Sequence, residues 1–287
     1  MIILDLNQVM ISNLMMSLQG HSIDVDENLL RHMILNSIRM NRVKFGSEYG
    51  ELVIACDDKN YWRKQLFPYY KASRRKNREK SDLDWNSIFT SLNKIRDEIK
   101  EYFPYRVIQS EHAEADDIIG VLCYEYGMPV GGDPILILSG DKDFQQLQKF
   151  ANVEQYDPVR KRWLRCNDPA QFLLEHVLRG DSGDGVPNVL SPDDTFVSGG
   201  RQKPIRAKFI DAVLSADWPE DCTLFTSEIT RNYHRNVKLI DLSNTPDNIR
   251  EDVLTQFGEQ EGKSRKDLFN YFIKNKLKLL TECISEF

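Results

Sequence analysis

The stretch ILILSGDKDFQQL, from Ile135 to Leu147, joins an apolar run directly to two carboxylates. The run ILIL is typical of a strand that is buried on both faces. Asp141 and Asp143 follow it, two residues apart. Two neighbouring carboxylates repel each other, and burying them gains nothing unless a positive charge joins them. The end of this strand therefore predicts a site for a positively charged partner.

Three further short apolar runs lie in the first half of the chain, and segments patterned for helices separate them. The runs are MIILDLN at 1–7, ELVIACDD at 51–58 and YRVIQSE at 105–111. The segment before the last run repeats apolar residues at helical spacing, namely Ile88, Leu92, Ile95 and Ile99. Strands that alternate with helices form a parallel sheet covered on both faces. We therefore expect an α/β fold with a doubly wound, mostly parallel sheet.

Strand signals become sparse after Leu147. NVEQYDP at 152–158 and KRWLRC at 161–166 can form a hairpin, and AQFLLEHVLRG predicts a helix that ends at Gly180. Residues 191–206 have the composition of a loop, and the remainder is patterned mainly for helices. We place a domain boundary near residue 190, between an α/β domain (1–190) and a smaller, mainly α-helical domain (191–287).

The bulk composition excludes several classes of protein. Five scattered cysteines without a CxxC pair argue against a disulfide framework or a zinc site. No apolar run approaches the ~18 residues of a membrane helix, and MIILDLNQ lacks the basic lead of a signal peptide. The net charge is −6, yet residues 59–80 hold nine Lys or Arg and one Glu, so this segment carries +8 and the remainder −14. Such a basic segment on an acidic protein is compatible with a nucleic-acid partner.

Carboxylates follow the predicted strands repeatedly. Asp5, the pair Asp57 and Asp58, and the pair Asp141 and Asp143 lie at strand ends. Further acids occur in EADD at 114–117 and GDSGDG at 180–185. Each group alone has an ordinary explanation, because acids favour helix N-termini and Gly/Asp sequences form turns. Together they predict one cluster beyond the carboxyl ends of the strands, and its pKa values would rise steeply without cations.

The spacing in EADD leaves open which acids face this cluster. If the helix includes Glu114, then Glu114 and Asp117 share one face and Asp116 points elsewhere. If the helix begins at Ala115, Glu114 is a cap and can converge with Asp116. Oxygen ligands without His or Cys suit Mg²⁺ or Mn²⁺, and about seven carboxylates suit two ions that act on a phosphate. We expect the lone histidines to be structural or surface groups: His21, His32, His112, His176 and His234.

The basic segment KNYWRKQLFPYYKASRRKNREK, residues 59–80, interleaves five aromatic residues with its cations. Aromatic rings can stack on bases while cations hold phosphates. The alternative is a solvated basic helix whose aromatic residues pack inward. Because the segment directly follows Asp57 and Asp58, we expect it to overhang the acidic cluster. Weaker basic patches at 159–165 and 201–208 are surface groups or duplex contacts.

The ordered motifs resemble the flap endonuclease and 5′-nuclease family, and within it the ribonuclease H of T-even bacteriophages. They are Asp5, CDD, YWRK and YYKASRRK, EADD, SGDKDFQQL and RGDSGDGVPN. The resemblance extends to RHMILNSI, VKLIDLSNTPDNI and KLLTECISEF, and so spans the whole chain. It implies a PIN-like fold with a helical arch at about residues 59–85. It also implies 5′→3′ exonuclease and flap endonuclease activity that removes RNA primers from lagging-strand fragments, in the cytoplasm of an infected bacterium.

The same resemblance implies roles for individual residues. One Mg²⁺ would be held by Asp5, Asp57, Asp116 and Asp141. A second, largely through water, would be held by Glu114, Asp143, Asp181 and Asp184, and Mn²⁺ is expected to substitute. The residues implied to contact the scissile phosphate from the arch are Arg63 and Lys71. Those implied to bind nucleic acid are Tyr70, Arg74, Arg75, Lys76 and Arg78 in the arch, and Gly183 and Gly185 in a helix-hairpin-helix turn.

The implied partners are DNA and RNA/DNA duplexes with flaps, nicks or primers, and a phage single-strand-binding protein. The protein is expected to act as a monomer, with sliding-clamp binding left open. After the turn, VLSPDDTFVSGGRQKPI departs from the Gly-Ile/Val-Gly pattern with which this family binds a monovalent ion. There are two alternative classes of protein. One is a DNA-binding protein without catalysis. The other is a haloacid-type phosphatase, which requires an Asp where this chain has Asn7.

Overall fold

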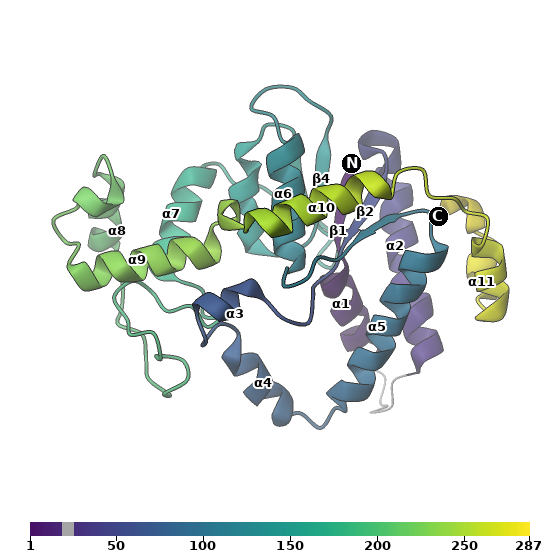
Figure 1. Cartoon of the computed structure of the whole chain (residues 1–287), viewed down its shortest axis with the longest axis horizontal. Helices are drawn as coiled ribbons and strands as arrows, with labels where there is room; N and C mark the ends of the chain where they lie inside the picture. Colours follow the sequence, from purple (N-terminus) through teal and green to yellow (C-terminus); the bar gives the residue numbers. More distant parts are fainter. Residues whose placement is uncertain (19–25) are drawn as a thin grey trace.

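The computed structural model describes residues 1–18 and 26–287. At its centre lies a six-stranded sheet with the strand order β3-β2-β1-β4-β5-β6 (Figure 1). The strands are β1 (Ile2–Asp5), β2 (Leu52–Ala55), β3 (Arg106–Ile108), β4 (Ile135–Leu138), β5 (Val153–Asp157) and β6 (Arg162–Leu164). The first five are parallel, and β6 pairs antiparallel with β5 in the expected hairpin. The predicted doubly wound, mostly parallel sheet is confirmed.

Helices cover both faces of the sheet. One face packs against α1 (Leu6–Leu18), α2 (Glu27–Tyr49) and α5 (Trp85–Tyr102). The other face packs against α6 (Ala115–Tyr126), the 3-10 helix η1 (Lys142–Lys149) and α10 (Asp247–Glu259). Ile2 and Leu4 of β1 belong to the first core and Ile3 to the second, as strand alternation requires. A strand buried on both faces explains why β1 and β4 are continuous apolar runs.

Between β2 and α5 the chain leaves the sheet as a bent, largely helical segment, hereafter the arch (residues 59–85). It contains α3 (Trp62–Leu66) and α4 (Ala72–Glu79), which Figure 1 shows running from the base of the sheet to the far end of α5. The expected helical arch is therefore present. The side chains of Arg75 and Lys76, both predicted to bind nucleic acid, lie outside the part of the chain that the structure describes.

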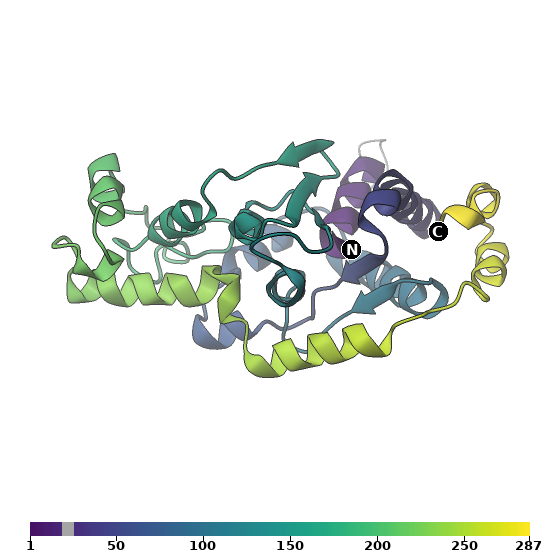
Figure 2. The same cartoon turned by 90° about the horizontal axis from the view of Figure 1, so that it is seen from above.

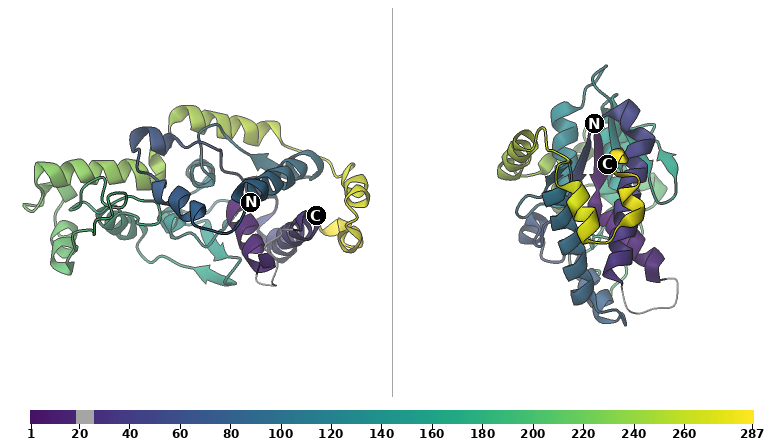
Figure 3. Two further views of the ribbon diagram at one scale, coloured as in Figure 1. Left: turned by 90° about the horizontal axis from the view of Figure 1, so that it is seen from below. Right: turned by 90° about the vertical axis from the view of Figure 1, so that its right-hand side faces the viewer.

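The segment from Pro169 to the C-terminus is mainly helical, as expected. Its elements are α7 (Pro169–Arg179), α8 (Ala207–Leu214), η2 (Pro219–Asp221), α9 (Ser227–Ile240), η3 (Leu242–Asn244), α10, α11 (Leu268–Lys274), α12 (Lys278–Thr281) and η4 (Ile284–Glu286). Helices α9 and α10 follow one another along one side of the molecule (Figure 2). The last helices return to α2 and α5 (Figure 3), where Tyr271, Phe272 and Phe287 surround Phe103. The domain boundary near residue 190 stays a prediction.

Among residues 1–18 and 26–287, no helix combines the length and the apolar character needed to cross a membrane.

Candidate metal centre

The carboxyl ends of the parallel strands bring four carboxylates to one edge of the sheet. Asp5 ends β1, Asp57 follows β2, Asp116 lies in the first turn of α6, and Asp141 is the N-cap of η1. All four line one open cavity of about 430 Å³. Tyr61, Lys64, Lys71 and Arg74 of the arch line the same cavity. The structure thus brings together the four acids assigned to the first cation, beneath basic residues of the arch.

The pKa values of these four carboxylates are raised, which means that their negative charges are not balanced by nearby positive groups. Burial, reinforced by neighbouring Asp57, raises the pKa of Asp5 to about 7. Burial and neighbouring Asp143 raise the pKa of Asp141 to about 6, and burial also raises the pKa values of Asp57 and Asp116. Such a cluster binds either protons or cations. Because its donors are all oxygens, it fits Mg²⁺ or Mn²⁺.

The first turn of α6 resolves the alternative that the sequence left open. The helix begins at Ala115, and Glu114 and Asp117 form a capping box at its start. Asp116 faces the cavity, whereas Asp117 turns away and accepts hydrogen bonds from Trp62 Nε1 (3.1 Å) and Thr245 Oγ1 (3.1 Å). Asp58 is also engaged elsewhere, because it accepts a hydrogen bond from the His112 backbone N–H (2.9 Å). Asp116 is therefore the acid of EADD that belongs to the first cluster.

Glu114, which was predicted to hold the second cation with Asp143, Asp181 and Asp184, shares Lys71 and Tyr70 with Asp184 and is already engaged by the arch. Its carboxylate forms an ion pair with Lys71, lies 3.0 Å from Arg63 Nη1 and lies 2.9 Å from Tyr70 Oη. Three cationic or hydroxyl partners already satisfy this buried carboxylate. The structure therefore gives Glu114 the task of holding the arch, and in particular Lys71, over the cavity.

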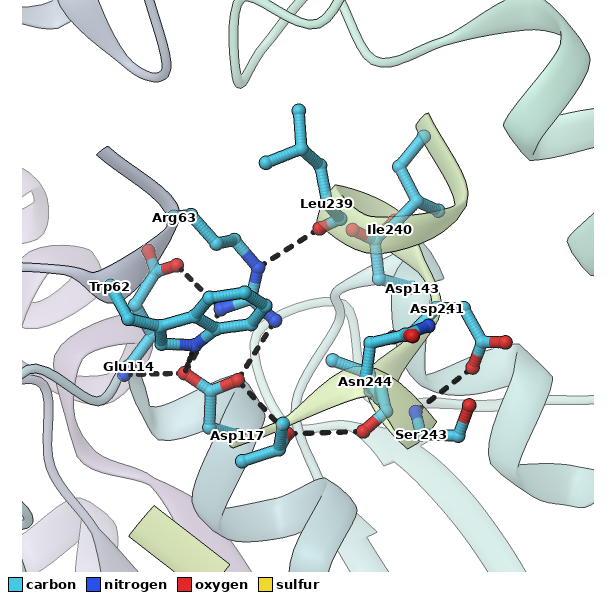
Figure 4. A network of polar contacts seen from close by, with 12 residues as sticks. Trp62, Arg63, Glu114, Asp117, Asp143, Leu239, Ile240, Asp241, Ser243 and Asn244 are labelled. Atoms are coloured by element: carbon cyan, nitrogen blue, oxygen red, sulfur yellow. Dashed lines mark hydrogen bonds and ion pairs between the residues drawn. The ribbon is translucent and has the colours of Figure 1, made fainter. Parts of the chain in front are cut away.

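The expected phosphate contact of Arg63 is contradicted by its position. Arg63 is only 1% exposed, and its guanidinium bonds Glu114, Asp117 and the Leu239 carbonyl at 2.8–3.0 Å (Figure 4). These contacts leave no free edge for a phosphate. Arg63 instead ties the base of the arch to α6 and to the end of α9.

Lys71 does reach the cavity. Its Nζ forms the ion pair with Glu114 and lies 3.4 Å from Asp184 Oδ2, while its backbone N–H donates to the Asp184 carbonyl at 2.7 Å. Burial acts to lower the pKa of Lys71, but Glu114 and Asp184 outweigh burial and raise the pKa above its usual value. Lys71 also adopts the left-handed backbone conformation, with φ 54°. The side chain is therefore a fixed positive charge at the wall of the site.

Other predicted nucleic-acid contacts divide between exposed and buried positions. Arg74 is half-exposed and pairs with Asp184 at 2.6 Å, and exposed Arg78 lies over the Phe89 ring. Tyr70 is buried against Phe67 and α7, so the structure contradicts a base-stacking role for its ring.

A second cavity, of about 850 Å³, lies beside the first, between the arch and α5. The two cavities share four lining residues, which are Lys64, Lys71, Arg78 and Phe89. This continuity gives a basic passage under the arch.

The turn of residues 180–186 brings Asp181 and Asp184 against the arch. Asp181 Oδ1 accepts the backbone N–H groups of Gly183 (2.7 Å) and Asp184 (3.2 Å), and Asp181 bridges to Val186. Gly185 has φ +75°, and a Cβ there would lie 3.0 Å from the Tyr69 carbonyl. The structure therefore uses Gly185 for the close approach of turn and arch. Duplex binding by Gly183 and Gly185 stays a prediction.

Asp143 and Asp181 meet a residue that the sequence did not place in the site. His176, in the last turn of α7, has Nε2 2.9 Å from Asp143 Oδ1 and 3.5 Å from Asp181 Oδ2. Lys142 also joins this group, with Nζ 2.8 Å from Asp181 Oδ2. Lys142 can turn toward Asp181 because β4 has already ended and η1 begins at this residue. One feature of the sequence could have indicated that His176 lies at the site. It stands five residues before Asp181, at the end of the helix that leads into the turn.

The raised carboxylate pKa values predict how pH and metal affect stability. Because folded pKa values of about 7 and 6 for Asp5 and Asp141 exceed the usual 3.8, their stabilising contribution is present at low pH and lost as pH rises. In EDTA, the melting temperature should therefore fall between pH 5 and pH 8. Mg²⁺ should raise it by several degrees at pH 8 and by much less at pH 5. A calorimetric scan in which Mg²⁺ had equal effects at both pH values would contradict this.

Comparisons with known proteins agree with this arrangement. Residues 21–174 match the model of the 5′-3′ exonuclease N-terminal, resolvase-like domain, and residues 169–287 match the C-terminal domain of T4 RNase H. The chain is 33% identical over 293 residues to the ribonuclease H of Enterobacteria phage T4, covering 99% of this chain and 95% of that protein. It is 31% identical over 140 residues to the flap endonuclease Xni of Shewanella sp. (strain MR-4), covering 46% of this chain and 49% of that protein.

Solved structures show the same fold at low sequence identity. A bacteriophage T5 flap endonuclease, in a pseudo-enzyme-product complex with DNA and metal ions, has a TM-score of 0.66 and 16% identity. The alignment covers 90% of this chain and 98% of that one. A T5 5′-exonuclease with bound divalent metal ions (zinc) has a TM-score of 0.59 and 15% identity, with 91% and 99% coverage.

Proposed function

We propose that this chain, which belongs to the 5′-3′ exonuclease family, is a divalent-metal-dependent nuclease that removes RNA primers from lagging-strand fragments during phage DNA replication. Its full-length relative is a phage ribonuclease H, and other relatives are flap endonucleases. The observation that carries the proposal is the convergence of Asp5, Asp57, Asp116 and Asp141 beneath the basic arch. Buried acids facing a basic passage suit a phosphodiester substrate that is held with metal ions.

The residues present would hold two Mg²⁺ ions, for which Mn²⁺ could substitute. The four acids of the first cavity would hold one ion, and Asp143, Asp181 and Asp184 the other. When bound, such ions lower the pKa of an attacking water and offset the charge of the phosphate and leaving oxygen.

The chain itself orients the carboxylates for this task. Asp5 accepts hydrogen bonds from the Gln8 backbone N–H (3.0 Å) and from Ser139 Oγ (3.1 Å). Asp57 accepts hydrogen bonds from the Ala115 backbone N–H (2.7 Å) and from Asn7 Nδ2. Each donor fixes one carboxylate oxygen and leaves the group aimed at the cavity, because hydrogen bonds of this kind orient ligands. Asn7 thus supports a ligand at the position where a haloacid-type phosphatase requires its second Asp.

Lys71 would contact the scissile phosphate. Its ammonium lies at the cavity wall, held by Glu114, and could offset negative charge that develops on the phosphate. Exposed Arg74 and Arg78 would hold neighbouring phosphates of a single strand under the arch. In this proposal the protein acts as a monomer in the cytoplasm of the infected cell, and a single-strand-binding protein is its partner.

The test is cleavage of end-labelled 5′-flap DNA, nicked DNA and an RNA/DNA hybrid, each with Mg²⁺ and with EDTA. We expect short 5′ products from these substrates in Mg²⁺ and none in EDTA. A DNA-binding protein without catalysis, the alternative class, would retard the flap substrate in a gel but yield no product in either Mg²⁺ or Mn²⁺. That result would overturn the proposal.

A further inference from the structure

Three donor side chains from three separate segments converge beside the first cavity. They are Asp143 from η1, His176 from the last turn of α7 and Asp181 from the turn that follows. One ligand atom of each lies within 4.8 Å of the other two. His176 Nε2 is the central atom, at 2.9 Å from Asp143 Oδ1 and 3.5 Å from Asp181 Oδ2.

The two closest of these atoms have no hydrogen-bond partner among the described residues. His176 is only 6% exposed, and both its Nε2 and Asp143 Oδ1 are buried without a hydrogen bond, although they lie 2.9 Å apart. The two atoms are therefore close to each other without forming a hydrogen bond. Buried polar atoms are almost always paired, and an ion is one of the partners that can pair them. A cation that both atoms coordinate would satisfy them together.

The surroundings hold the His176 ring in place and leave a small cavity beside the two aspartates. Phe172, one helical turn before His176, stacks on the imidazole with ring centroids 5.8 Å apart. A cavity of about 10 Å³, close to the size of one water, lies beside two of the three donors, Asp143 and Asp181, and its other polar lining residues are Asp116, Asp184, Tyr70 and Arg63. Lys142 is the competing cation at Asp181, but its side chain is half-exposed and can turn to solvent.

We propose that His176 coordinates, through Nε2, the cation that Asp143 and Asp181 hold. A nitrogen donor changes which metals this site prefers, because imidazole suits Zn²⁺ and similar metals whereas Mg²⁺ takes oxygen ligands. The first cavity, with oxygen donors alone, has no such preference. The chain therefore carries two unlike cation sites. This inference rests on the proposed function only for the existence of the second cation site.

The test follows the histidine ring nitrogens of ¹⁵N-labelled protein by NMR during titration with Zn²⁺, a diamagnetic probe. We expect the Nε2 resonance of one histidine to shift and saturate, and this resonance should be missing in His176→Gln. By calorimetry, His176→Gln should weaken Zn²⁺ binding by roughly tenfold or more and Mg²⁺ binding by about threefold or less. His234→Gln, at a half-exposed histidine paired with Glu220, is the matched control and should change neither affinity.

Two results would overturn the inference. The first is a His176 resonance that stays in place at saturating Zn²⁺. The second is an equal loss of Zn²⁺ and Mg²⁺ affinity in His176→Gln, which would make His176 a counter-ion or packing group. If His176→Gln does not fold, the wild-type titration decides alone, because Gln variants of the other four histidines assign the remaining signals. Cleavage in Mg²⁺ would survive either result, so failure here is distinguishable from failure of the proposed nuclease function.

Discussion

Replacing Asp141 by Asn is expected to lower the single-turnover rate of flap cleavage by at least about a thousandfold, while binding of the flap DNA persists. Asp141 occupies the junction of the two groups of acids. It lines the cavity with Asp5, Asp57 and Asp116, and neighbouring Asp143 contributes to raising its pKa. Loss of this carboxylate removes a negatively charged donor that the cations need for binding and orientation.

The Asn side chain should leave the fold intact. Asp141 Oδ1 accepts the backbone N–H of Asp143 at 3.0 Å to cap η1, and an Asn oxygen can accept the same bond. Removing one of several mutually repelling carboxylates should also keep the metal-free protein at least as stable as the wild type. The matched control is Asp217→Asn, at an exposed acid in the bend between α8 and η2. If the Asp141 variant cut flap DNA at the wild-type rate, Asp141 would have no part in the chemistry.

Replacing Lys71 by Ala is expected to lower the same rate by about a hundredfold, with metal binding largely retained. Among the described arch cations that line the first cavity, Lys71 is the buried one, at 9% exposure, and its ammonium pairs with Glu114. Its charge could offset charge that develops on the phosphate, in a setting where water screens little. Cleavage, more than DNA binding, should therefore depend on it.

The Lys71 variant should remain folded for reasons visible in its contacts. Glu114 keeps Arg63 and Tyr70 as partners, and the backbone bond from residue 71 to the Asp184 carbonyl needs no side chain. Lys80→Ala, at an exposed lysine near the end of α4, is the matched control within the arch. Single-turnover rates at saturating protein measure the effect. A near-normal rate in the Lys71 variant would exclude Lys71 from the site.

The sheet and the first group of acids could be predicted because their signals are local. Each buried strand is an apolar run, and parallel strands deliver whatever follows them to a common edge. The position of Asp5, Asp57 and Asp141 at this edge could therefore be predicted without knowledge of distant contacts. The start of α6 could not be predicted in this way. It depends on the extended backbone of Glu114 and on the bond from its N–H to Asp117 (2.9 Å), and the spacing of acids does not encode either.

The predictions were wrong for three residues whose partners lie far along the chain, namely Arg63, Tyr70 and His176. Arg63 bonds a carbonyl 176 residues away at the end of α9, and Tyr70 meets Asp184 across 114 residues. A basic, aromatic segment has the same composition whether a given side chain faces solvent or the protein interior. His176 stands in an ordinary amphipathic helix, and only the packing of α7 against η1 brings it to Asp143.

The most direct test is to locate Mn²⁺ in crystals of the protein by anomalous scattering. We expect two peaks at the carboxyl edge of the sheet. One should lie among Asp5, Asp57, Asp116 and Asp141, and the other among Asp143, His176 and Asp181. No peak at this edge at saturating Mn²⁺, with DNA-binding competence intact, would contradict a metal-dependent nuclease site there.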